Sequence, residues 1–303
     1  MKNWTLFGCI AAVLSAVAAC GGEKPANSPP STSASEQGAT STTPAATAQE
    51  GIRLYVFDCG NIDVLDVSAF HPEYGKGEKT KLAATCYLIK HPKGTLQWDT
   101  GLSDGLLKVP EGKNVGFAVL HVTKGLAAQY QELGIAPDSV NFVGISHMHS
   151  DHSGNLNLFP HATVLMQKEE YEAAFSADPS KYRFDPTAYP TLKANPVKKL
   201  EGDLDVFGDG TVVVKREIGH TPGHQVLFLK LPKTGNIVLS GDLVHFAENW
   251  TKRNVPGFNF DKQESIKAMA DVDQFLKANH ATLWIQHDYP QNQTIKHAPA
   301  YYE

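Results

Sequence analysis

The stretch of sequence that decides the fold is SHMHSDHSGN at residues 146–155, which directly follows the strand-like run VNFVGI at residues 140–145. His147 and His149 are two positions apart on an extended turn and can bind one metal ion together, while the Asp-His pair after them points toward a second position. This spacing is typical of a dinuclear metal site, and the competing interpretation is a polar surface turn. The 13 histidines of the chain are many for its length and favour the metal site.

Length and composition allow one large or two small domains and disfavour nucleic acid as a partner. The chain has 303 residues, of which 42% are hydrophobic and 19% are charged, so it can form a buried core. With 27 Lys and Arg against 32 Asp and Glu, the net charge is -5 and no basic excess attracts a phosphate backbone. Four cysteines are too few for a disulfide scaffold.

The N-terminal part of the chain reads as a targeting signal followed by a linker. Residues 1–19 contain an apolar run that ends in small residues, as a secretory signal peptide does. The ending VAAC resembles a bacterial lipobox, which implies cleavage before Cys20 and a lipid on that cysteine; a plain secreted protein is the alternative. Because Gly21 follows, resemblance to Gram-negative lipoproteins implies an outer-membrane lipoprotein facing the periplasm, which touches the membrane only through its anchor. Residues 20–50 are then the lipidated cysteine and a disordered linker without large apolar side chains.

Residues 51–303 are expected to form one α/β domain. Apolar, β-branched and aromatic runs predict strands at 53–58, 84–90, 95–99, 140–145, 162–167, 211–217, 225–231, 236–240 and 282–286. Helices are predicted at 123–133 and at 261–278, where Asp261 is the N-cap. The apolar face of the second helix is predicted to contain Ile266, Met269, Ala270 and Leu276. Grouped strands with helices between the groups indicate packed sheets flanked by helices.

Two cysteines, Cys59 and Cys86, lie in or beside strand-like runs of the domain. Export would place them in an oxidising compartment. A disulfide between neighbouring strands is one interpretation, and two buried thiols are the other.

The metal motif resembles the signature of the metallo-β-lactamase superfamily, and later segments match that family over essentially all of residues 51–303. The resemblance implies an α/β fold with a four-layer αββα sandwich. It also implies three further metal ligands, which lie in loops far from the first motif.

Three later segments resemble the remaining metal motifs of the superfamily. In GHTPGHQ, the later histidine, His224, would bind the first metal and His220 would brace the turn. Asp242, in a Gly-Asp pair after a strand-like run, would bridge both ions, and His287 would complete the second site. The implied ligand set is His147, His149 and His224 on one ion and Asp151, His152 and His287 on the other, with Asp242 between them.

Imidazole and carboxylate ligands of this kind suit two zinc ions, with manganese, cobalt or iron as alternatives. Iron members of the superfamily usually have a carboxylate in place of His149. Zinc lowers the pKa of bound water from 15.7 to about 7, so a bridging hydroxide forms at neutral pH. Asp151 would orient that hydroxide and pass its proton to the leaving oxygen, which fits the hydrolysis of esters and lactones.

Within the superfamily, three features most resemble the N-acyl homoserine lactone lactonases: the HTPGHQ motif, the bridging Asp242 and the first strand-like run, LYVFDCG at residues 54–60. The implied partner is a small acyl lactone, and the implied activity is that of a carboxylic ester hydrolase that opens the lactone ring. Opening the ring would silence a diffusible signal, an activity called quorum quenching. Two positions depart from the pattern, because His245 replaces a tyrosine that binds substrate in some lactonases and Gln286 replaces a glycine. His245 could act catalytically as a hydrogen-bond donor to the oxyanion, and its alternative is a structural or exposed histidine.

An acyl chain needs an apolar groove. Candidates for its lining are Phe70, Tyr74, residues 115–120, Tyr182, Phe184, Tyr189, Phe258 and Phe260. Each of these side chains is also interpretable as an ordinary packing residue.

Other esterases, thioesterases and one non-enzymatic function are the alternatives. A β-lactamase of the subclass without a cysteine ligand lacks a bridging carboxylate, so Asp242 disfavours it. A glyoxalase II would need a basic glutathione cradle and an added helical domain, and a tRNA-processing nuclease is disfavoured by export and acidity. A surface zinc-binding lipoprotein without turnover is disfavoured by Asp151 and Asp242, since storage does not require both.

Overall fold

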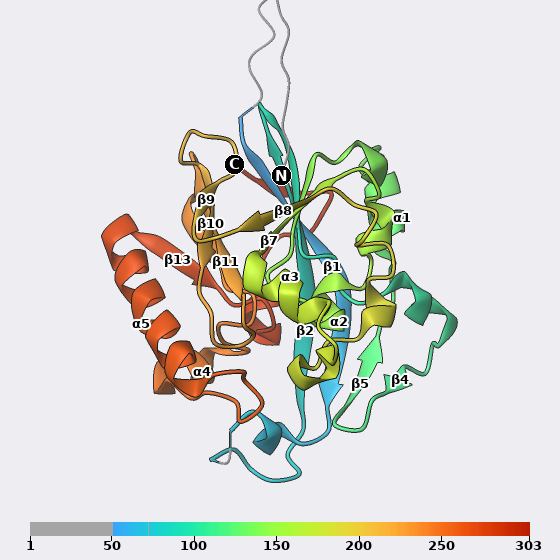
Figure 1. Ribbon diagram of the computed structural model, residues 1–303, viewed down its shortest axis with the longest axis vertical. Coiled ribbons are helices and arrows are strands. Elements are labelled where there is room, and N and C mark those ends of the chain that lie inside the picture. Colours follow the sequence, from blue (N-terminus) through green and yellow to red (C-terminus); the bar gives the residue numbers. More distant parts are fainter. Residues whose placement is uncertain (1–50, 72) are drawn as a thin grey trace, which may run out of the picture. The chain divides into compact units, whose positions relative to one another are not determined.

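Two β-sheets packed face to face carry the predicted metal-binding segments (Figure 1). The computed structural model describes residues 51–71 and 73–303. The predicted signal peptide at 1–19, Cys20 and the linker at 20–50 lie outside the described residues. Helices on the outer face of each sheet complete the four layers, which confirms the predicted αββα sandwich.

The first sheet has nine strands and the second has five. In spatial order the first contains β4 (Lys113–Asn114), β5 (Ala118–His121), β1 (Arg53–Val64), β2 (Thr80–His91), β3 (Gly94–Trp98), β6 (Phe142–Gly144), β7 (Thr163–Gln167) and β8 (Val197–Leu200), and β14 (Tyr301–Tyr302) also pairs with β1. The second contains β13 (Ala281–Trp284), β12 (Gly235–Leu239), β11 (Gln225–Leu231), β10 (Val212–Arg216) and β9 (Leu204–Asp205). The pairs from β3 to β8 and the pair β12–β13 are parallel, and the others are antiparallel.

Helices lie on both outer sides of the sheets (Figure 1). The first sheet is covered by α1 (Leu126–Glu132), α2 (Ser150–Ser153) and α3 (Lys168–Ala174). The second is covered by α4 (Ala247–Lys252) and α5 (Lys262–Asn279), and α6 (Tyr289–Asn292) contacts β2. Short 3-10 helices occur at Val67–Ala69, Asp104–Lys108, Pro137–Ser139, Leu156–Leu158, Pro179–Tyr182 and Pro186–Ala188.

Alternate side chains of the strands fill the space between the two sheets. Leu54 and Val56 of β1 share one buried cluster with Leu227 of β11. Phe57 points to the outer face of the first sheet, where its ring centroid lies 5.3 Å from that of Tyr130 in α1. Because both faces of β1 are buried at residues 54–57, this part of its sequence is continuously apolar rather than alternating.

The predicted long helix is present, but part of its predicted apolar face is wrong. Asp261 caps α5, since its Oδ1 accepts from the main-chain N of Gln263 at 2.8 Å and of Glu264 at 3.0 Å. The residues of α5 that face the second sheet are Ser265, Ala268, Met269, Val272 and Leu276. Ile266 is 38% exposed and Ala270 is also exposed, because both lie about one residue away from the buried stripe.

Cys59 and Cys86 form a disulfide between β1 and β2, with their Cα atoms 5.9 Å apart. Both side chains are buried. Of the two interpretations of these cysteines, the structure therefore contains the disulfide.

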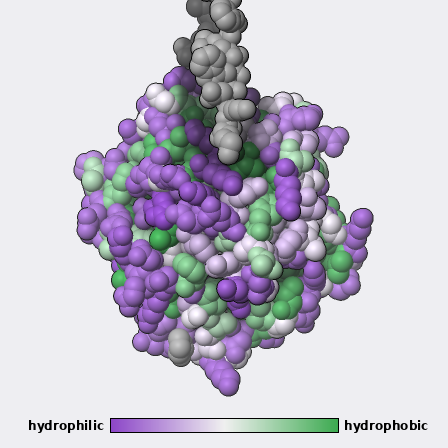
Figure 2. Space-filling model, viewed as in Figure 1, coloured by the Kyte–Doolittle hydropathy of each residue, from purple (hydrophilic) through white to green (hydrophobic). Residues whose placement is uncertain are grey.

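Hydrophilic side chains cover most of the face shown in Figure 2. The large hydrophobic side chains that are exposed are Leu107, Val115, Phe117, Phe260 and Ile266. Within the described part of the chain, no helix combines the length and apolar composition needed to cross a bilayer.

Candidate metal centre

Seven side chains that can bind metal meet at the ends of strands from both sheets. They form one group of His147, His149, His220 and Asp242 and a second group of Asp151, His152 and His287. The segment after β6, which includes α2, supplies four of them, and the β10–β11 turn and the ends of β12 and β13 supply one each. Within each group, the ligand atoms all lie within 4.8 Å of one another.

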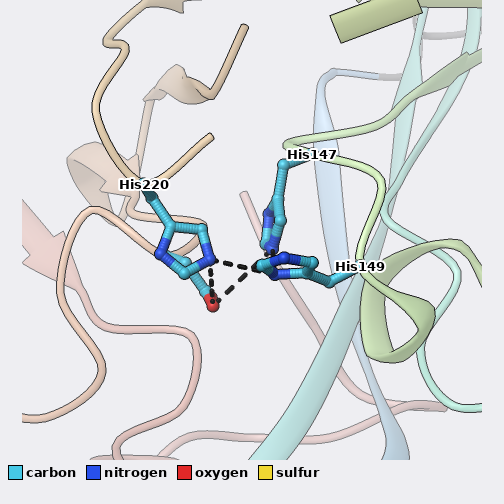
Figure 3. A group of neighbouring side chains, drawn as sticks. His147, His149 and His220 are labelled. Atoms are coloured by element: carbon cyan, nitrogen blue, oxygen red, sulfur yellow. Dashed lines mark hydrogen bonds and ion pairs between the residues drawn. The ribbon is translucent and has the colours of Figure 1, made fainter. Parts of the chain in front are cut away.

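The first group is a triangle of imidazoles beside one carboxylate. Figure 3 shows the rings of His147, His149 and His220 turned toward one another. Nδ1 of His149 lies 2.9 Å from Nε2 of His147 and 3.0 Å from Nε2 of His220. Oδ2 of Asp242 lies 3.2 Å from Nε2 of His220 and 3.7 Å from Nε2 of His147.

In each ring, the hydrogen bond made by the nitrogen that faces away from the cluster determines whether the nitrogen that faces the cluster carries a proton or a lone pair. Nε2 of His149 donates to the carbonyl of Tyr182 at 3.0 Å, and Nδ1 of His220 donates to Oδ1 of Asn259 at 3.1 Å. A neutral imidazole carries one proton, so the nitrogens that face the centre present lone pairs. Buried lone pairs at 3.0 Å repel each other unless a cation lies among them, so this donor set fits a metal ion.

The same reasoning holds for the second group. Nδ1 of His152 donates to Oδ2 of Asp99 at 2.8 Å, and Nδ1 of His287 donates to a main-chain carbonyl of β2 at 2.6 Å. Their Nε2 atoms lie 3.1 Å apart and face the same space, where each would offer a lone pair to a bound metal ion. Oδ1 of Asp242 lies 3.1 Å and 3.0 Å from these two nitrogens, and Oδ2 of Asp151 lies 3.5 Å from Nε2 of His287. Asp242 thus faces both groups, as a bridging ligand must.

The structure departs from the sequence prediction at His224. Nδ1 of His224 donates to the carbonyl of Glu217 at 2.8 Å, and its Nε2 accepts from the main-chain N of Asp242 at 2.9 Å. The main chain therefore satisfies both ring nitrogens, whereas His220 directs a lone pair at the Asp242 carboxylate. The two roles are exchanged, so that His220 joins the candidate ligands and His224 braces the loop.

Electrostatics at the centre favour a cation. Burial lowers the pKa of His149 to about 3 and holds that of His147 well below its ordinary value. Burial acts to raise the pKa of Asp242, but the surrounding imidazoles, His287 first, hold it well below its usual range. For His152, burial acts to lower the pKa, and three carboxylates, Asp242 first, raise it overall. A divalent ion would meet this demand for positive charge in place of a proton.

Asp99, which the sequence analysis did not assign to the site, orients His152 from behind. It is fully buried and follows β3 with a left-handed backbone, φ 51°, which costs energy for a non-glycine residue. Its carboxylate accepts from the main-chain N and Oγ of Ser146 at 2.6 and 2.8 Å, from His152, and from Nε2 of Gln286 at 2.7 Å. Gln286, one of the two departures from the lactonase pattern, therefore supports the ligand His152 indirectly.

A second buried carboxyl, that of Glu170 in α3, ties the two ligand loops together. Its Oε1 accepts from the main-chain N of Met148 at 2.8 Å, and its Oε2 accepts from Thr221 Oγ1 and the main-chain N of Gly223, each at 2.8 Å. Burial raises the pKa of Glu170 to about 7, against the effect of these hydrogen bonds. A Cβ atom at Gly223 would lie 2.5 Å from the main-chain N of Glu170, so only glycine permits this approach.

A cavity of about 420 Å³ opens onto both groups of candidate ligands. Its apolar wall contains Ile62, Ala69, Phe70, Leu82, Val115, Phe117, Leu120 and Phe258. Its polar lining contains His149, Ser150, Asp151, Arg183, His220, Asp242, His245 and His287. Of the other aromatic residues considered for a groove, Tyr74, Phe184 and Tyr189 are buried in packing clusters instead.

His245 lies in the cavity wall next to the bridging carboxylate. Its Nε2 is 3.1 Å from Oδ2 of Asp242, and its ring stacks on that of His287 with centroids 5.7 Å apart. The residue is 4% exposed, and its Nδ1 has no hydrogen-bond partner among the described residues. Burial lowers the pKa of His245 to about 4, so its ring is neutral at pH 7.

Replacing His220 by alanine should weaken metal binding far more than replacing His224 by glutamine. Alanine removes a lone pair, whereas a glutamine amide at position 224 can still accept from Asp242 and donate to Glu217. We expect His220→Ala to lower zinc affinity by at least about 100-fold and His224→Gln by less than about tenfold. Competition with a chromogenic chelator measures both, with the exposed His161→Ala as control. An equal or larger loss in His224→Gln would return the ligand role to His224.

The fold and this geometry can be compared with known proteins. The family model described as metallo-beta-lactamase superfamily matches residues 80–283. The N-acyl homoserine lactonase AttM of Azorhizobium caulinodans is 30% identical over 261 residues, which cover 83% of this chain and 99% of that protein. The N-acyl homoserine lactonase of Bacillus thuringiensis is 26% identical over 255 residues, which cover 82% of this chain and 98% of that protein.

Solved structures agree with these relationships. An N-acyl homoserine lactone hydrolase with the product N-hexanoyl-L-homoserine at its catalytic metal centre superposes with a TM-score of 0.72 and 25% identity, covering 82% of this chain and 98% of that one. The dizinc quorum-quenching lactonase AidC, with a TM-score of 0.61 and 18% identity over 83% of this chain and 94% of its own, shares the fold. The family predicted from the sequence is confirmed, and this chain belongs to the metallo-β-lactamase superfamily.

Proposed function

We propose that this protein is a dinuclear zinc hydrolase that opens the lactone ring of N-acyl homoserine lactones and so removes a diffusible signal. The observation that carries the proposal is that candidate ligands of both groups and eight apolar side chains line one cavity. A polar reactive head and an acyl chain could therefore bind side by side. The lactonase activity named for its relatives supports the choice of substrate.

In this proposal each group of side chains holds one zinc ion. His147, His149 and His220 would hold the first ion, Asp151, His152 and His287 would hold the second, and Asp242, which faces both groups, would contribute to both. Zinc, when bound, lowers the pKa of a water molecule to about 7 and polarises a carbonyl oxygen. Imidazole and carboxylate donors without sulfur favour zinc, and manganese, cobalt or iron could occupy the same donors.

Asp151 is the carboxylate best placed to move a proton. Its side chain is 22% exposed and lines the cavity, whereas that of Asp242 is 4% exposed. Burial acts to raise its pKa, but neighbouring imidazoles, His152 first, lower it overall, so it is charged at neutral pH. Asp151 would hold the attacking water, accept the proton that this water loses as it adds to the carbonyl, and pass that proton to the ring oxygen when the lactone C–O bond breaks.

His245 would act on the other side of the reacting carbonyl. The His245 side chain lines the cavity, and its Nε2 lies 3.1 Å from Oδ2 of Asp242. With its single proton on Nε2, the neutral ring could donate to a carbonyl oxygen bound beside Asp242 as negative charge develops there. This is the task of the tyrosine at the corresponding place in the lactonases that the sequence resembles.

A substrate panel tests the proposed activity directly. Zinc-loaded protein should open acyl homoserine lactones with a kcat/KM at least about tenfold above that for nitrocefin, lactoylglutathione or aryl esters, which corresponds to about 1.4 kcal/mol of transition-state preference. Equal or greater efficiency on nitrocefin would favour a β-lactamase. No turnover of any substrate would favour the non-enzymatic zinc-binding lipoprotein.

The roles of Asp151 and His245 predict different losses. Asp151→Asn removes both a metal ligand and the proton carrier, so it should abolish nearly all lactone turnover. His245→Ala should lower kcat by about 100- to 1000-fold, the cost of one oxyanion donor, with zinc content unchanged. Steady-state kinetics and metal analysis of the pure variants measure both. If His245→Ala keeps most of the turnover, its proposed electrophilic role is wrong.

We also propose that the protein is a lipoprotein of the cell envelope, attached through Cys20 to the outer membrane and facing the periplasm. The support is the apolar run at residues 1–19 that ends at Cys20. Cells fed a palmitate analogue should label the wild type and leave Cys20→Ser unlabelled. An unlabelled wild type, or equal label on both, contradicts the anchor.

A further inference from the structure

Arg183 is a cation in the cavity wall that neither the metal centre nor the proposed proton transfers use. Among the described residues that line the cavity, it is the single lysine or arginine. No carboxylate of the described ranges forms an ion pair with it within 4.0 Å. Its guanidinium lies over the ring of Phe258, 4.8 Å from the centroid, so an apolar wall of the cavity holds one face of this cation.

The backbone conformation of Arg183, which lines the cavity, is energetically unfavourable for a residue other than glycine. Arg183 ends the 3-10 helix Pro179–Tyr182 in a left-handed conformation, with φ 61° and ψ 22°. A glycine would adopt this conformation without strain, so local stability does not explain an arginine here. The preceding carbonyl, that of Tyr182, accepts the hydrogen bond from Nε2 of His149. The turn that carries Arg183 is thereby fixed relative to a candidate metal ligand.

The neighbours of Phe258 place Arg183 on the same side of the cavity as the proposed reaction. The ring of Phe258 lies 5.7 Å from that of His245 and 5.5 Å from that of Phe70, centroid to centroid. Phe258 therefore contacts both the guanidinium of Arg183 and the ring of His245, so that two side chains with hydrogen-bond donors adjoin one apolar ring. A ligand seated on that ring could meet a different donor at each end.

An N-acyl homoserine lactone offers three oxygen atoms to such a site. In the proposed function, the metal pair, His245 and Asp151 act on the lactone carbonyl and the ring oxygen. The carbonyl of the amide is left over, and it loses its bonds to water when the acyl chain enters the apolar part of the cavity. One face of the Arg183 guanidinium lies over the Phe258 ring, while its N–H groups point outward in the guanidinium plane. These N–H groups are suitable donors for that oxygen.

We infer that Arg183 is a specificity-determining residue that binds the amide carbonyl of the acyl chain and so selects N-acylated lactones over plain alkyl lactones. This inference rests on the proposed function. It concerns recognition of the substrate and leaves ring opening to the residues already described. Arg183 binds a part of the substrate that plain lactones lack.

The test compares two substrates on the same variants. Arg183→Gln should raise KM for N-hexanoyl homoserine lactone and lower the preference for it over γ-nonalactone, measured as a ratio of kcat/KM, by at least about tenfold. Arg183→Lys should recover part of the preference, because it keeps the charge and loses the planar donor set. The matched control is Lys181→Gln, an exposed cation in the same turn, which should keep the wild-type ratio.

The zinc content of each variant is measured alongside the kinetics, because Arg183 adjoins the carbonyl that holds His149. An unchanged substrate ratio in Arg183→Gln, or a loss that accompanies lost zinc, overturns the inference while leaving lactone hydrolysis intact. If the wild type opens neither lactone, the proposed function fails, and this inference fails with it.

Discussion

The structure of the site depends most on the hydrogen-bond acceptor that contacts the outward-facing nitrogen of each imidazole. Asp99 accepts a hydrogen bond from Nδ1 of His152, the Tyr182 carbonyl accepts one from Nε2 of His149, and Oδ1 of Asn259 accepts one from Nδ1 of His220. The opposite nitrogens then face one another and the carboxylate of Asp242, where each can offer a lone pair to a cation. Such a cluster is costly to bury without a cation, so folding itself builds an affinity for metal.

The ligands come from loops of two different sheets, which must approach within hydrogen-bond distance. Glu170 joins the His147–His149 loop to the turn that carries His220, and glycines allow the main chains to close up. A Cβ atom at Gly241 would lie 2.7 Å from Nε2 of His224, which in turn accepts from the neighbouring Asp242. His224 therefore positions Asp242 from behind, through the main chain, and is not itself one of the candidate ligands.

Much of the site could be predicted from the sequence because the spacing at residues 147–152 is local and specific, and the order of later motifs then located Asp242 and His287. His220 and His224 could not be separated, because both are histidines of one turn and only the partner behind each ring distinguishes them. Arg183 carried no signal, since the cavity that it lines forms only when distant segments meet. Two-residue strands such as Leu204–Asp205 are too short for periodicity to reveal, and the buried stripe of the Lys262–Asn279 helix was misplaced by about one residue.

The central claim is that two metal ions share Asp242 at this centre. Elemental analysis of pure active protein, followed by stepwise removal and return of zinc, tests it most directly. The account predicts two equivalents of transition metal per chain, with activity lost on chelation and restored as the second equivalent returns. Fewer than two equivalents in fully active protein, or activity that survives chelation, would contradict it.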